Sequence, residues 1–234
     1  MCGFAGFIDT KSFSENILYR MTEVLNHRGP DDRGIWINKD IGIGFAHTRL
    51  AILDVSQAGK QPMESRSGRY VIIFNGEIYN HLELRKEVEY KNNLQKNNWV
   101  GYSDTETLLA AIETWGIEVT LKKLNGMFAF AIYDKKNQNL ILARDRIGEK
   151  PLYYGWQNNT FLFASELKAI KEHPNFDNEI NENIIPLYLK YNYIPEPYSI
   201  YKNIYKLKPG SFITILCNNK SKNIEEKDYW SLIN

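Results

Sequence analysis

Eight short apolar runs, rich in β-branched and aromatic residues, recur along the chain, and a fold without extended sheets could not accommodate them. Polar turn sequences separate several of the runs, such as Lys136 to Asn139 and Gln157 to Asn159. Runs of this length and composition, bounded by turns, are typical of strands and hairpins. The predicted strands cover residues 3–8, 41–47, 70–74, 127–133, 139–143, 152–156, 161–164 and 211–216.

Four helices are expected between these strands. Ser12 to Glu15 and Ser103 to Glu106 both have the Ser-x-x-Glu form of a capping box, ahead of periodic apolar residues. The first helix should end near His27, a third should follow Asn80, and a fourth should be capped by Ser165. Because amphipathic helices bury their apolar faces against sheets, the pattern favours a layered α+β arrangement.

The composition limits the class of protein. With 234 residues, 43% of them hydrophobic and 13% aromatic, the chain can form one large globular domain. Twenty-nine basic and 28 acidic residues leave a net charge of +1, without a basic run that would indicate nucleic-acid or anionic-membrane binding. Neither an 18-residue apolar span nor a signal-peptide pattern is present. We expect a cytoplasmic protein with small neutral or zwitterionic ligands, and with no nucleic-acid or membrane partner.

Cys2 directly follows the initiator methionine, and removal of Met1 would leave it with both a thiol and a free amine. A thiol attacks as thiolate, and its ordinary pKa of about 8.5 leaves little of it ionised at neutral pH, so a base is needed. The α-amine, with a pKa of about 7.7–8.0, is partly neutral near pH 7 and can serve. Cys2 is therefore predicted to be a nucleophile that carries its own base. The alternative is a small buried residue that opens a strand.

Hydrolysis of an amide also requires donors for the tetrahedral oxyanion. Asn75 can supply a side-chain N–H and Gly76 a backbone N–H, and glycine lets the backbone approach a ligand closely. The same Asn-Gly pair is, however, the strongest short-range signal for a hairpin turn. Both interpretations are open from these residues.

Other reactive side chains are interpreted as structural. Cys217 lies in a strand-like run, and His47 is redundant as a base beside an N-terminal amine. The cysteines and the four histidines lack metal-ligand spacing, and no Gly-rich phosphate loop occurs, so no metal or cofactor is expected in this chain. Residues 89–98, rich in Asn and Lys, are expected to form a mobile surface loop.

Several motifs together resemble one family, over the range from Cys2 to about Trp230. It is the glutaminase domain of class II glutamine amidotransferases, in the branch of glutamine-hydrolysing asparagine synthetases. The motifs are Cys2-Gly3, His27-Arg28-Gly29-Pro30-Asp31-Asp32, Arg49-Leu50-Ala51-Ile52-Leu53-Asp54, Asn75-Gly76-Glu77-Ile78-Tyr79-Asn80, Ser103-Asp104-Thr105-Glu106, Leu124 to Phe130 and Ala143 to Tyr154.

The resemblance implies an N-terminal nucleophile hydrolase fold, which is α+β and built as a four-layer αββα sandwich of antiparallel sheets. The glutaminase domain is expected at residues 2–194. Residues 195–234 would form a β-rich extension leading toward a synthetase domain that this sequence does not contain. The segment from His27 to Asp32 resembles the family's loop that closes over bound glutamine.

The resemblance also implies a role for each site residue. Free glutamine carries an α-carboxylate and an α-ammonium, so one planar cation and one or two carboxylates suit its recognition. Without the resemblance, Arg49 could be a solvated surface arginine, and Asp104 could simply complement a helix dipole. The implied roles are nucleophile for Cys2, oxyanion hole for Asn75 and Gly76, carboxylate binding for Arg49, and ammonium binding for Asp104, Glu77 and the carbonyl of Ile52.

The expected activity is hydrolysis of glutamine to glutamate and ammonia through a thioester on Cys2. In the family, ammonia then passes to a synthetase domain that uses ATP and Mg²⁺ to amidate aspartate or a related carboxylate. Glutamine and a synthetase domain or subunit are the expected partners, and a homodimer is compatible with the resemblance. Two alternatives are the glutaminase half of another class II amidotransferase, and a catalytically silent docking or regulatory module that retains Met1.

Overall fold

The computed structural model describes residues 1–9, 14–93, 99–217 and 222–232. Its strands form two six-stranded sheets in which every pairing is antiparallel. The strands are β1 (Gly3–Ile8), β2 (Asp32–Asn38), β3 (Ile43–Arg49), β4 (Met63–Glu64), β5 (Tyr70–Ile78), β6 (Gly126–Asp134), β7 (Asn139–Arg144), β8 (Tyr153–Gln157), β9 (Thr160–Ala164), β10 (Tyr205–Lys206), β11 (Ser211–Leu216) and β12 (Ile224–Asp228).

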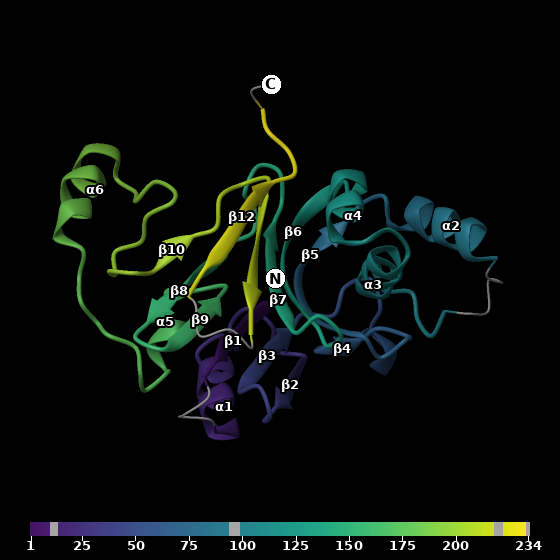
Figure 1. The fold of residues 1–234 in the computed structure, drawn as a ribbon, viewed down its shortest axis with the longest axis horizontal. Helices are drawn as coiled ribbons and strands as arrows, with labels where there is room; N and C mark the ends of the chain where they lie inside the picture. Colours follow the sequence, from purple (N-terminus) through teal and green to yellow (C-terminus); the bar gives the residue numbers. More distant parts are fainter. Residues whose placement is uncertain (10–13, 94–98, 218–221, 233–234) are drawn as a thin grey trace.

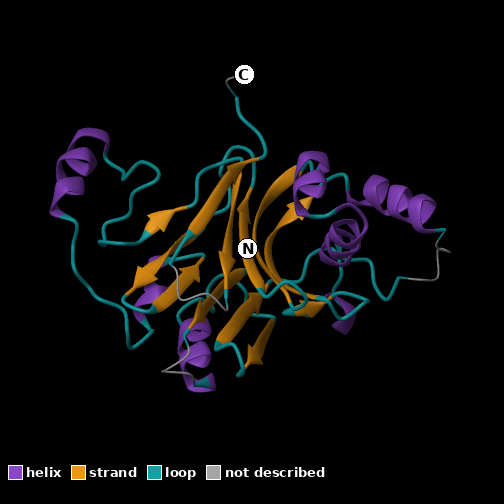
Figure 2. Cartoon of the chain, viewed as in Figure 1, coloured by secondary structure: helices purple, strands orange, loops and turns teal. Residues whose placement is uncertain are grey.

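The first sheet has the strand order β10-β8-β9-β1-β3-β2, and the second has the order β12-β11-β7-β6-β5-β4. Helices lie on the outer faces of both sheets (Figures 1 and 2). The helices are α1 (Glu15–Glu23), α2 (His81–Asn92), α3 (Asp104–Trp115), α4 (Ile117–Lys123), α5 (Leu167–Lys171) and α6 (Ile185–Tyr191), with short 3₁₀ turns at Gln57–Gly59 and Glu182–Ile184.

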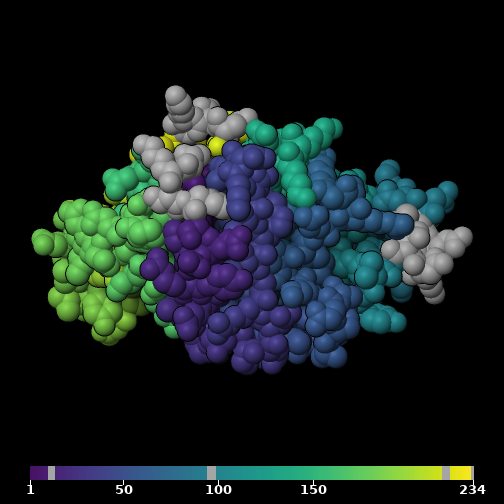
Figure 3. All heavy atoms as spheres, turned by 90° about the horizontal axis from the view of Figure 1, so that it is seen from below, coloured from purple at the N-terminus to yellow at the C-terminus, as the bar shows by residue number. Residues whose placement is uncertain are grey.

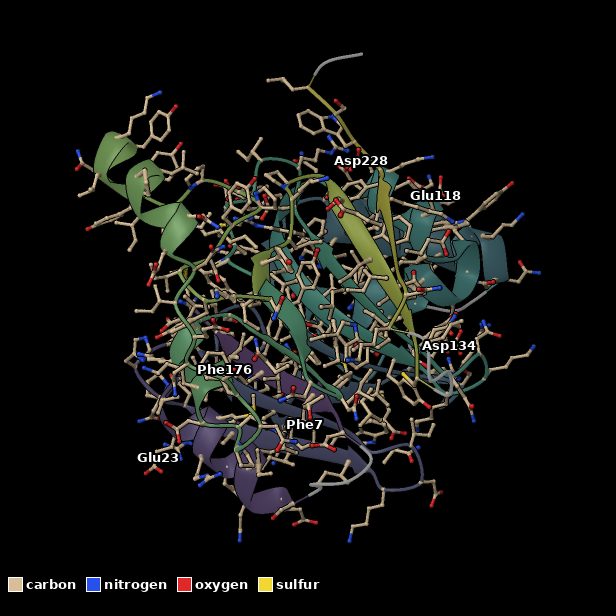
Figure 4. The ribbon with its side chains drawn as sticks, turned by 60° about the vertical axis from the view of Figure 1, so that its left-hand side comes forward. Phe7, Glu23, Glu118, Asp134, Phe176 and Asp228 are labelled. Atoms are coloured by element: carbon tan, nitrogen blue, oxygen red, sulfur yellow. The ribbon has the colours of Figure 1, made fainter. Side chains whose placement is uncertain are left out.

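Three apolar layers hold the molecule together. One lies between the sheets and includes Phe4, Phe45 and Ile73. A second lies between the second sheet and helices α2 to α4, and a third joins the first sheet to α1 and α5. Phe7 and Phe176 of this third layer are labelled in Figure 4, near α1. The predicted α+β class and four-layer αββα sandwich are therefore confirmed.

The eight strands expected from the sequence are all present. The strand predicted at residues 3–8 matches β1 at both ends, and the other seven have shifted ends, whereas β2, β4, β10 and β12 were not predicted. Edge position explains these omissions, because all four are the outermost strands of their sheets. The sequence of β12 is Ile-Glu-Glu-Lys-Asp, and its last four residues are exposed. Charged side chains are common on edge strands, where they discourage pairing with other chains, and they remove the apolar alternation that identifies a strand.

Helix α3 begins as predicted, since the Ser103 hydroxyl accepts a hydrogen bond from the amide of Glu106. The start predicted for the first helix was wrong by two residues, because Ser14 is the N-cap of α1. Ser12 lies outside the described residues. The N-cap predicted at Ser165 was also wrong, because its hydroxyl accepts from the amide of Phe4 and does not cap α5.

Helix α2 follows Asn80 as predicted, although the Asn80 side chain makes no cap bond to it. The carboxamide instead accepts from the amide of Asn125, on the segment before β6. The loop predicted for residues 89–98 was partly wrong, because α2 continues to Asn92 and ends on a left-handed Asn93. Residues 94–98 lie outside the described part of the chain.

The C-terminal strands are integrated into both sheets. Strand β10 pairs with β8 in the first sheet, and β11 pairs with β7 in the second. Helix α6 stands apart at one side of the molecule and buries none of its residues (Figure 1). Figure 3 shows the molecule from below, with the purple N-terminal residues in the middle of this face. The green residues, which include α6, lie on one side of them, and the blue to teal residues lie on the other. The domain boundary at residues 194 and 195 stays a prediction.

Candidate active site

Strand β1 carries Cys2 into the space between the sheets. It lies inside the first sheet, paired with β3 on one side and β9 on the other. Phe4 and Ile8 belong to the inter-sheet layer, whereas Ala5 and Phe7 face the helices. Side chains alternate along a strand, so continuation of this alternation places Cys2 on the inter-sheet side.

The same alternation orients two further strands toward Cys2. On β3, Ile43 and Phe45 face the inter-sheet layer, which places Arg49 on that side. On β5, Val71 and Ile73 face it, and Asn75 and Glu77 follow at the same period. The hydrogen bond of 3.0 Å between His47 Nε2 on β3 and the carbonyl of Phe74 on β5 links the two sheets at this level.

One cavity of about 90 Å³ has all seven predicted site residues in its wall. They come from four separate parts of the chain, so the structure brings together every position that the sequence singled out. The predicted site residues in the wall are Cys2, Arg49, Ile52, Asn75, Gly76, Glu77 and Asp104, and the other lining residues include Met1, Leu50, Asp54, Gln61, Phe74, Met127 and Lys150.

Size alone does not identify the site. A cavity of about 590 Å³ lies among α2, α3 and the β4 region, and one of about 420 Å³ lies beside α1 and β2. Neither has a cysteine or a histidine in its wall. Because amide hydrolysis needs a nucleophile next to oxyanion donors, the smaller cavity with Cys2 is the candidate active site.

The Cys2 side chain contacts the main chain of Leu50. Its sulfur lies 3.6 Å from the carbonyl oxygen of Leu50 and 3.4 Å from the amide nitrogen of Leu50. Burial raises the pKa of the thiol, although the Leu50 amide, the N-terminal amine and Arg49 oppose this effect. The Cys2 thiol is therefore protonated at neutral pH in this form of the chain and needs a base to react.

Asn75 and Gly76 lie inside β5, paired with Ala129 and Phe128 of β6, so the hairpin-turn interpretation was wrong. Asn75 is 1% exposed, and its side-chain nitrogen has no hydrogen-bond partner among the described residues. At Gly76 a β-carbon would stand 2.3 Å from the carbonyl oxygen of Met127. Only glycine therefore fits at position 76. The side-chain amide of Asn75 has an N–H donor that no protein group uses among the described residues.

Arg49 is not a solvated surface residue. It is 7% exposed, its Nη1 donates to the carbonyl of Ser56 over 2.9 Å, and its Nη2 donates to the carbonyl of Asp54. Two of its five N–H groups are therefore engaged by the loop that follows β3, which leaves others for a carboxylate. Ile52, on the same loop, is 65% exposed at the cavity mouth.

Asp104 is the first residue of α3, where its charge complements the helix dipole. Its carboxylate also accepts the amide of Ile78 over 2.9 Å and lies in the cavity wall, so the helix and ligand roles are compatible. Burial raises the pKa of Asp104 to about 6, and the nearby charge of Glu77 adds to this effect. Asp104 therefore loses its charge at a higher pH than an ordinary carboxyl.

His47 and Cys217 have the environments expected of structural residues. His47 is fully buried, and burial lowers its pKa to about 4 despite its hydrogen bond to Phe74. Cys217 packs against the inter-sheet layer, and burial raises the pKa of its thiol to about 12. Neither residue lines the cavity that holds Cys2.

Lys150 is a buried cation of the cavity wall that the sequence reasoning missed. Its Nζ lies 3.3 Å from the sulfur of Met1. The Asp145 carboxylate accepts the amide of Lys150 over 2.9 Å, and Arg144 Nε donates to its carbonyl over 2.7 Å. These residues belong to the motif at residues 143–154, which was used only to identify the family. The motif could have drawn attention to Lys150, but nothing in the sequence indicated that its side chain reaches the cavity.

Arg28 is a second missed residue. Its Nε donates to the carbonyl of Cys2 over 2.9 Å, and its Nη1 pairs with Glu166 over 2.7 Å. It therefore ties the N-terminal residues to the segment before α5. The closure of residues 27–32 over glutamine, implied by the resemblance, stays a prediction.

No group of three or more His, Cys, Asp or Glu side chains in residues 1–9, 14–93, 99–217 and 222–232 is placed to hold a metal ion. None of the helices in those ranges has the length and apolar character needed to cross a membrane.

Comparison of the sequence with known proteins gives consistent matches. The family model described as "Glutamine amidotransferase domain" matches residues 1–230. The chain is 39% identical over 252 residues to a putative glutamine-hydrolysing asparagine synthetase 2 of Methanocaldococcus jannaschii, covering 99% of this chain and 47% of the relative. It is 40% identical over 220 residues to asparagine synthetase 1 of Bacillus subtilis, covering 92% and 33%. The chain thus spans half or less of these curated relatives.

The fold also matches solved structures. The glutamine phosphoribosylpyrophosphate amidotransferase of B. subtilis, complexed with ADP and GMP, superposes with a TM-score of 0.68 at 19% identity. The match covers all of this chain and 50% of that one. At this identity the likeness shows the fold, which is the expected N-terminal nucleophile hydrolase type. The match over residues 1–230, together with the relatives at 39% and 40% identity, shows that the chain belongs to the glutamine amidotransferase domain family.

Proposed function

We propose that this chain, once Met1 is removed, hydrolyses glutamine to glutamate and ammonia as the glutaminase part of an asparagine synthetase. The observation that carries the proposal is the meeting, in one cavity, of Cys2 with the buried and unpartnered amide nitrogen of Asn75. A nucleophile beside an unused buried donor is the arrangement that acyl transfer requires.

In the proposed reaction, the free α-amine of Cys2 takes the thiol proton, and the sulfur forms a bond to the side-chain carbonyl carbon of glutamine. The Asn75 side chain and the Gly76 backbone N–H stabilise the oxyanion. The ammonium of Cys2 returns the proton to the leaving nitrogen, so ammonia departs and a γ-glutamyl thioester remains. Water, deprotonated by the same amine, then attacks the thioester, which releases glutamate and restores the thiol.

Other residues of the cavity wall would recognise the α-carboxylate and α-ammonium of glutamine. Arg49 would bind the α-carboxylate, while Asp104, Glu77 and the Ile52 carbonyl would bind the α-ammonium. The relatives named asparagine synthetases support aspartate as the acceptor of the ammonia. That step would take place on a synthetase domain or subunit that binds ATP and Mg²⁺. A cytoplasmic location and the need for no cofactor in this chain are part of the same proposal.

The test compares three proteins whose N-terminal processing has been checked by intact mass. Processed wild type should release glutamate and ammonia from glutamine in equal amounts, Cys2→Ala should release neither, and Cys217→Ala should behave as wild type because its thiol lies outside the cavity. Glutamine should still bind to Cys2→Ala, for example by calorimetry. Ammonia release by Cys2→Ala would refute the mechanism, and an inert wild type after confirmed processing would favour a silent module.

A second measurement tests the division of labour with a synthetase. The 234 residues contain no Gly-rich phosphate loop of the kind that binds ATP. With glutamine, aspartate, ATP and Mg²⁺, the processed chain alone should still yield only glutamate and ammonia. Formation of asparagine, AMP or pyrophosphate by this chain would contradict its assignment as the glutaminase part alone.

A further inference from the structure

Asp54 has no assigned part in the proposed function, yet its carboxylate is among the most fully hydrogen-bonded groups in the cavity wall. It is 7% exposed. Its Oδ1 accepts the amide of Ser56 over 2.9 Å and the hydroxyl of Ser56 over 2.6 Å. Its Oδ2 accepts the amide of Tyr102 over 2.8 Å. The carboxylate therefore joins two segments that are far apart in the sequence.

The Ser56 bonds fold the loop after β3 around Arg49. With the loop in this shape, the main-chain carbonyls of Asp54 and Ser56 both accept from the Arg49 guanidinium. Packing is close here, since a β-carbon at Gly59 would stand 2.2 Å from Arg49 Nη2. The position of the guanidinium is thus set by a loop whose own shape depends on the Asp54 carboxylate.

The Tyr102 bond connects this loop to the segment that begins α3. Gly101 permits the approach, because a β-carbon there would stand 2.4 Å from Asp54 Oδ2. The segment is itself held firmly, since Arg85 donates to the carbonyls of Gly101 and Ser103 over 3.0 and 3.1 Å. Asp104 follows directly as the first residue of α3.

The charge of Asp54 suits this bridging position. Burial disfavours the ionised form, but the hydroxyl of Ser56, the amides of Tyr102 and Ser56 and the charge of Arg49 together keep the pKa of Asp54 below its usual value. The ionised carboxylate is thus the form present at neutral pH, and with no proton on either oxygen it accepts from both segments.

We propose that Asp54 is a positioning residue that fixes the span between the carboxylate-binding end of the site, at Arg49, and the ammonium-binding end, at Asp104. The inference rests on the proposed function. A fixed span suits a ligand with a free α-amino acid head group, in which the carboxylate and the ammonium are separated by one carbon. Asp54 acts through its neighbours and does not itself touch glutamine.

The direct test is Asp54→Asn. Asparagine can keep one acceptor for Ser56, but its amide group would face the N–H of Tyr102, so two donors would oppose each other. Loss of a hydrogen bond to a charged group, with a donor left unpaired, should raise the KM for glutamine roughly 10- to 100-fold. The kcat should stay within about threefold, because the reacting groups on β1 and β5 are unchanged.

Two labelling reagents separate this role from general damage. Iodoacetamide is small and neutral and needs only an accessible Cys2, whereas 6-diazo-5-oxo-L-norleucine must also be recognised by its amino-acid head group. In a Cys217→Ala background, Asp54→Asn should react with iodoacetamide at the wild-type rate and with the norleucine reagent roughly tenfold more slowly or worse. Equal slowing of both reagents, or no slowing of either, would overturn the proposal.

Asp134→Asn is the matched control. Asp134 is also a buried carboxylate that accepts turn amides, those of Lys136 and Asn137, and it lies at the β6–β7 turn, outside the cavity wall (Figure 4). Its loss should lower Tm without changing KM or either labelling rate. An equal rise in KM for Asp134→Asn would show that any buried carboxylate has this effect, which overturns the specific role of Asp54.

Gly101→Ala provides a second variant that leaves Asp54 in place, and it decides the question if Asp54→Asn does not fold. Its methyl group would push against Asp54 Oδ2 and should raise KM in the same direction. An unchanged KM in a folded Gly101→Ala protein would overturn the proposal. A processed wild type that neither hydrolyses glutamine nor reacts with the norleucine reagent would overturn the proposed function, whereas an active wild type with unaffected variants would overturn only the role of Asp54.

Discussion

A buried polar group without a partner is costly, and Asn75 provides an example in this protein. Its side-chain nitrogen is shielded from solvent and has no acceptor among the described residues. Leaving a buried donor unsatisfied costs about 1–3 kcal/mol. Such a cost is understandable where a ligand atom completes the bond, and an oxyanion on the substrate would supply that acceptor.

Asn75→Ala should therefore lower kcat roughly 10²- to 10³-fold, the usual effect of removing one oxyanion donor, with a smaller change in KM. Steady-state ammonia release over a range of glutamine concentrations measures both constants. Asn139→Ala is a suitable control, because Asn139 also has a buried side-chain atom without a partner but lies at the start of β7, away from the cavity. If Asn75→Ala kept a wild-type kcat, Asn75 would not be an oxyanion donor.

Asp104 gives the site a pH dependence whose direction follows from its raised pKa of about 6. Above that pH the carboxylate is ionised and attracts the α-ammonium of glutamine, and below it the charge is lost. KM should therefore rise as pH falls through about 6, approaching tenfold for each further pH unit. Asp104→Asn should have a high KM that hardly changes over the same range. A flat wild-type KM from about pH 7 to about pH 5 would contradict the assignment of Asp104 to the ammonium.

Among the elements, α3 links stability to the site, because its N-cap Ser103 immediately precedes Asp104. The Ser103 hydroxyl accepts the amide of Glu106 over 3.2 Å. Ser103→Ala should cost about 1 kcal/mol in the free energy of unfolding and should also raise KM by loosening Asp104. Ser14→Ala at α1 removes an equivalent cap bond, to the amide of Asn16 over 3.2 Å, away from the cavity.

Urea denaturation and glutamine kinetics on these two variants separate the effects. Both should lose similar stability, and only Ser103→Ala should change KM. A KM change in both variants would mean that loss of stability alone disturbs the site, and a KM change in neither would mean that the start of α3 does not depend on its cap.

Among the helices and strands, the sequence predicted the buried central strands better than the edge strands and the helix N-caps. Apolar runs identified β1 and β5 because both of their faces are buried, whereas the charged edge strand β12 shows no such pattern. Ser12 and Ser14 are both suitable N-cap residues for α1, and the local sequence does not distinguish them; in the structure the N-cap is Ser14. The Asn-Gly pair was ambiguous because its turn preference is local, while its place in β5 is decided by pairing with β6.

For the molecule as a whole, the site depends on strand order, which local sequence does not reveal. Cys2, Arg49, Asn75 and Asp104 meet because β1 and β3 are neighbours in one sheet while β5 and the start of α3 belong to the other half. The resemblance to a family supplied this arrangement before the structure did. No site role was predicted for Asp54 or Lys150, because their contacts are with residues far away in the sequence. Asp54 accepts the amide of Tyr102, and Lys150 lies against Met1.

The inter-sheet layer packs the two sheets against each other, and Phe163 tests its contribution to stability. Phe163 is fully buried, its ring meets that of Phe45 edge-on at a centroid distance of 5.9 Å, and a β-carbon at Gly6 would stand 2.3 Å from it. Phe163→Ala should lower the free energy of unfolding by about 3–5 kcal/mol, because it removes buried area and leaves a cavity.

Urea denaturation measures this loss, and Leu232→Ala, at a position 84% exposed, should leave stability unchanged. At a temperature where Phe163→Ala is still folded, its KM should stay close to that of wild type, because the groups that bind the amino-acid head are held by local bonds from Asp54 and α3. A tenfold rise in KM for folded Phe163→Ala would instead mean that the distance between the sheets, and not the local bonding at each end, sets the geometry of the site.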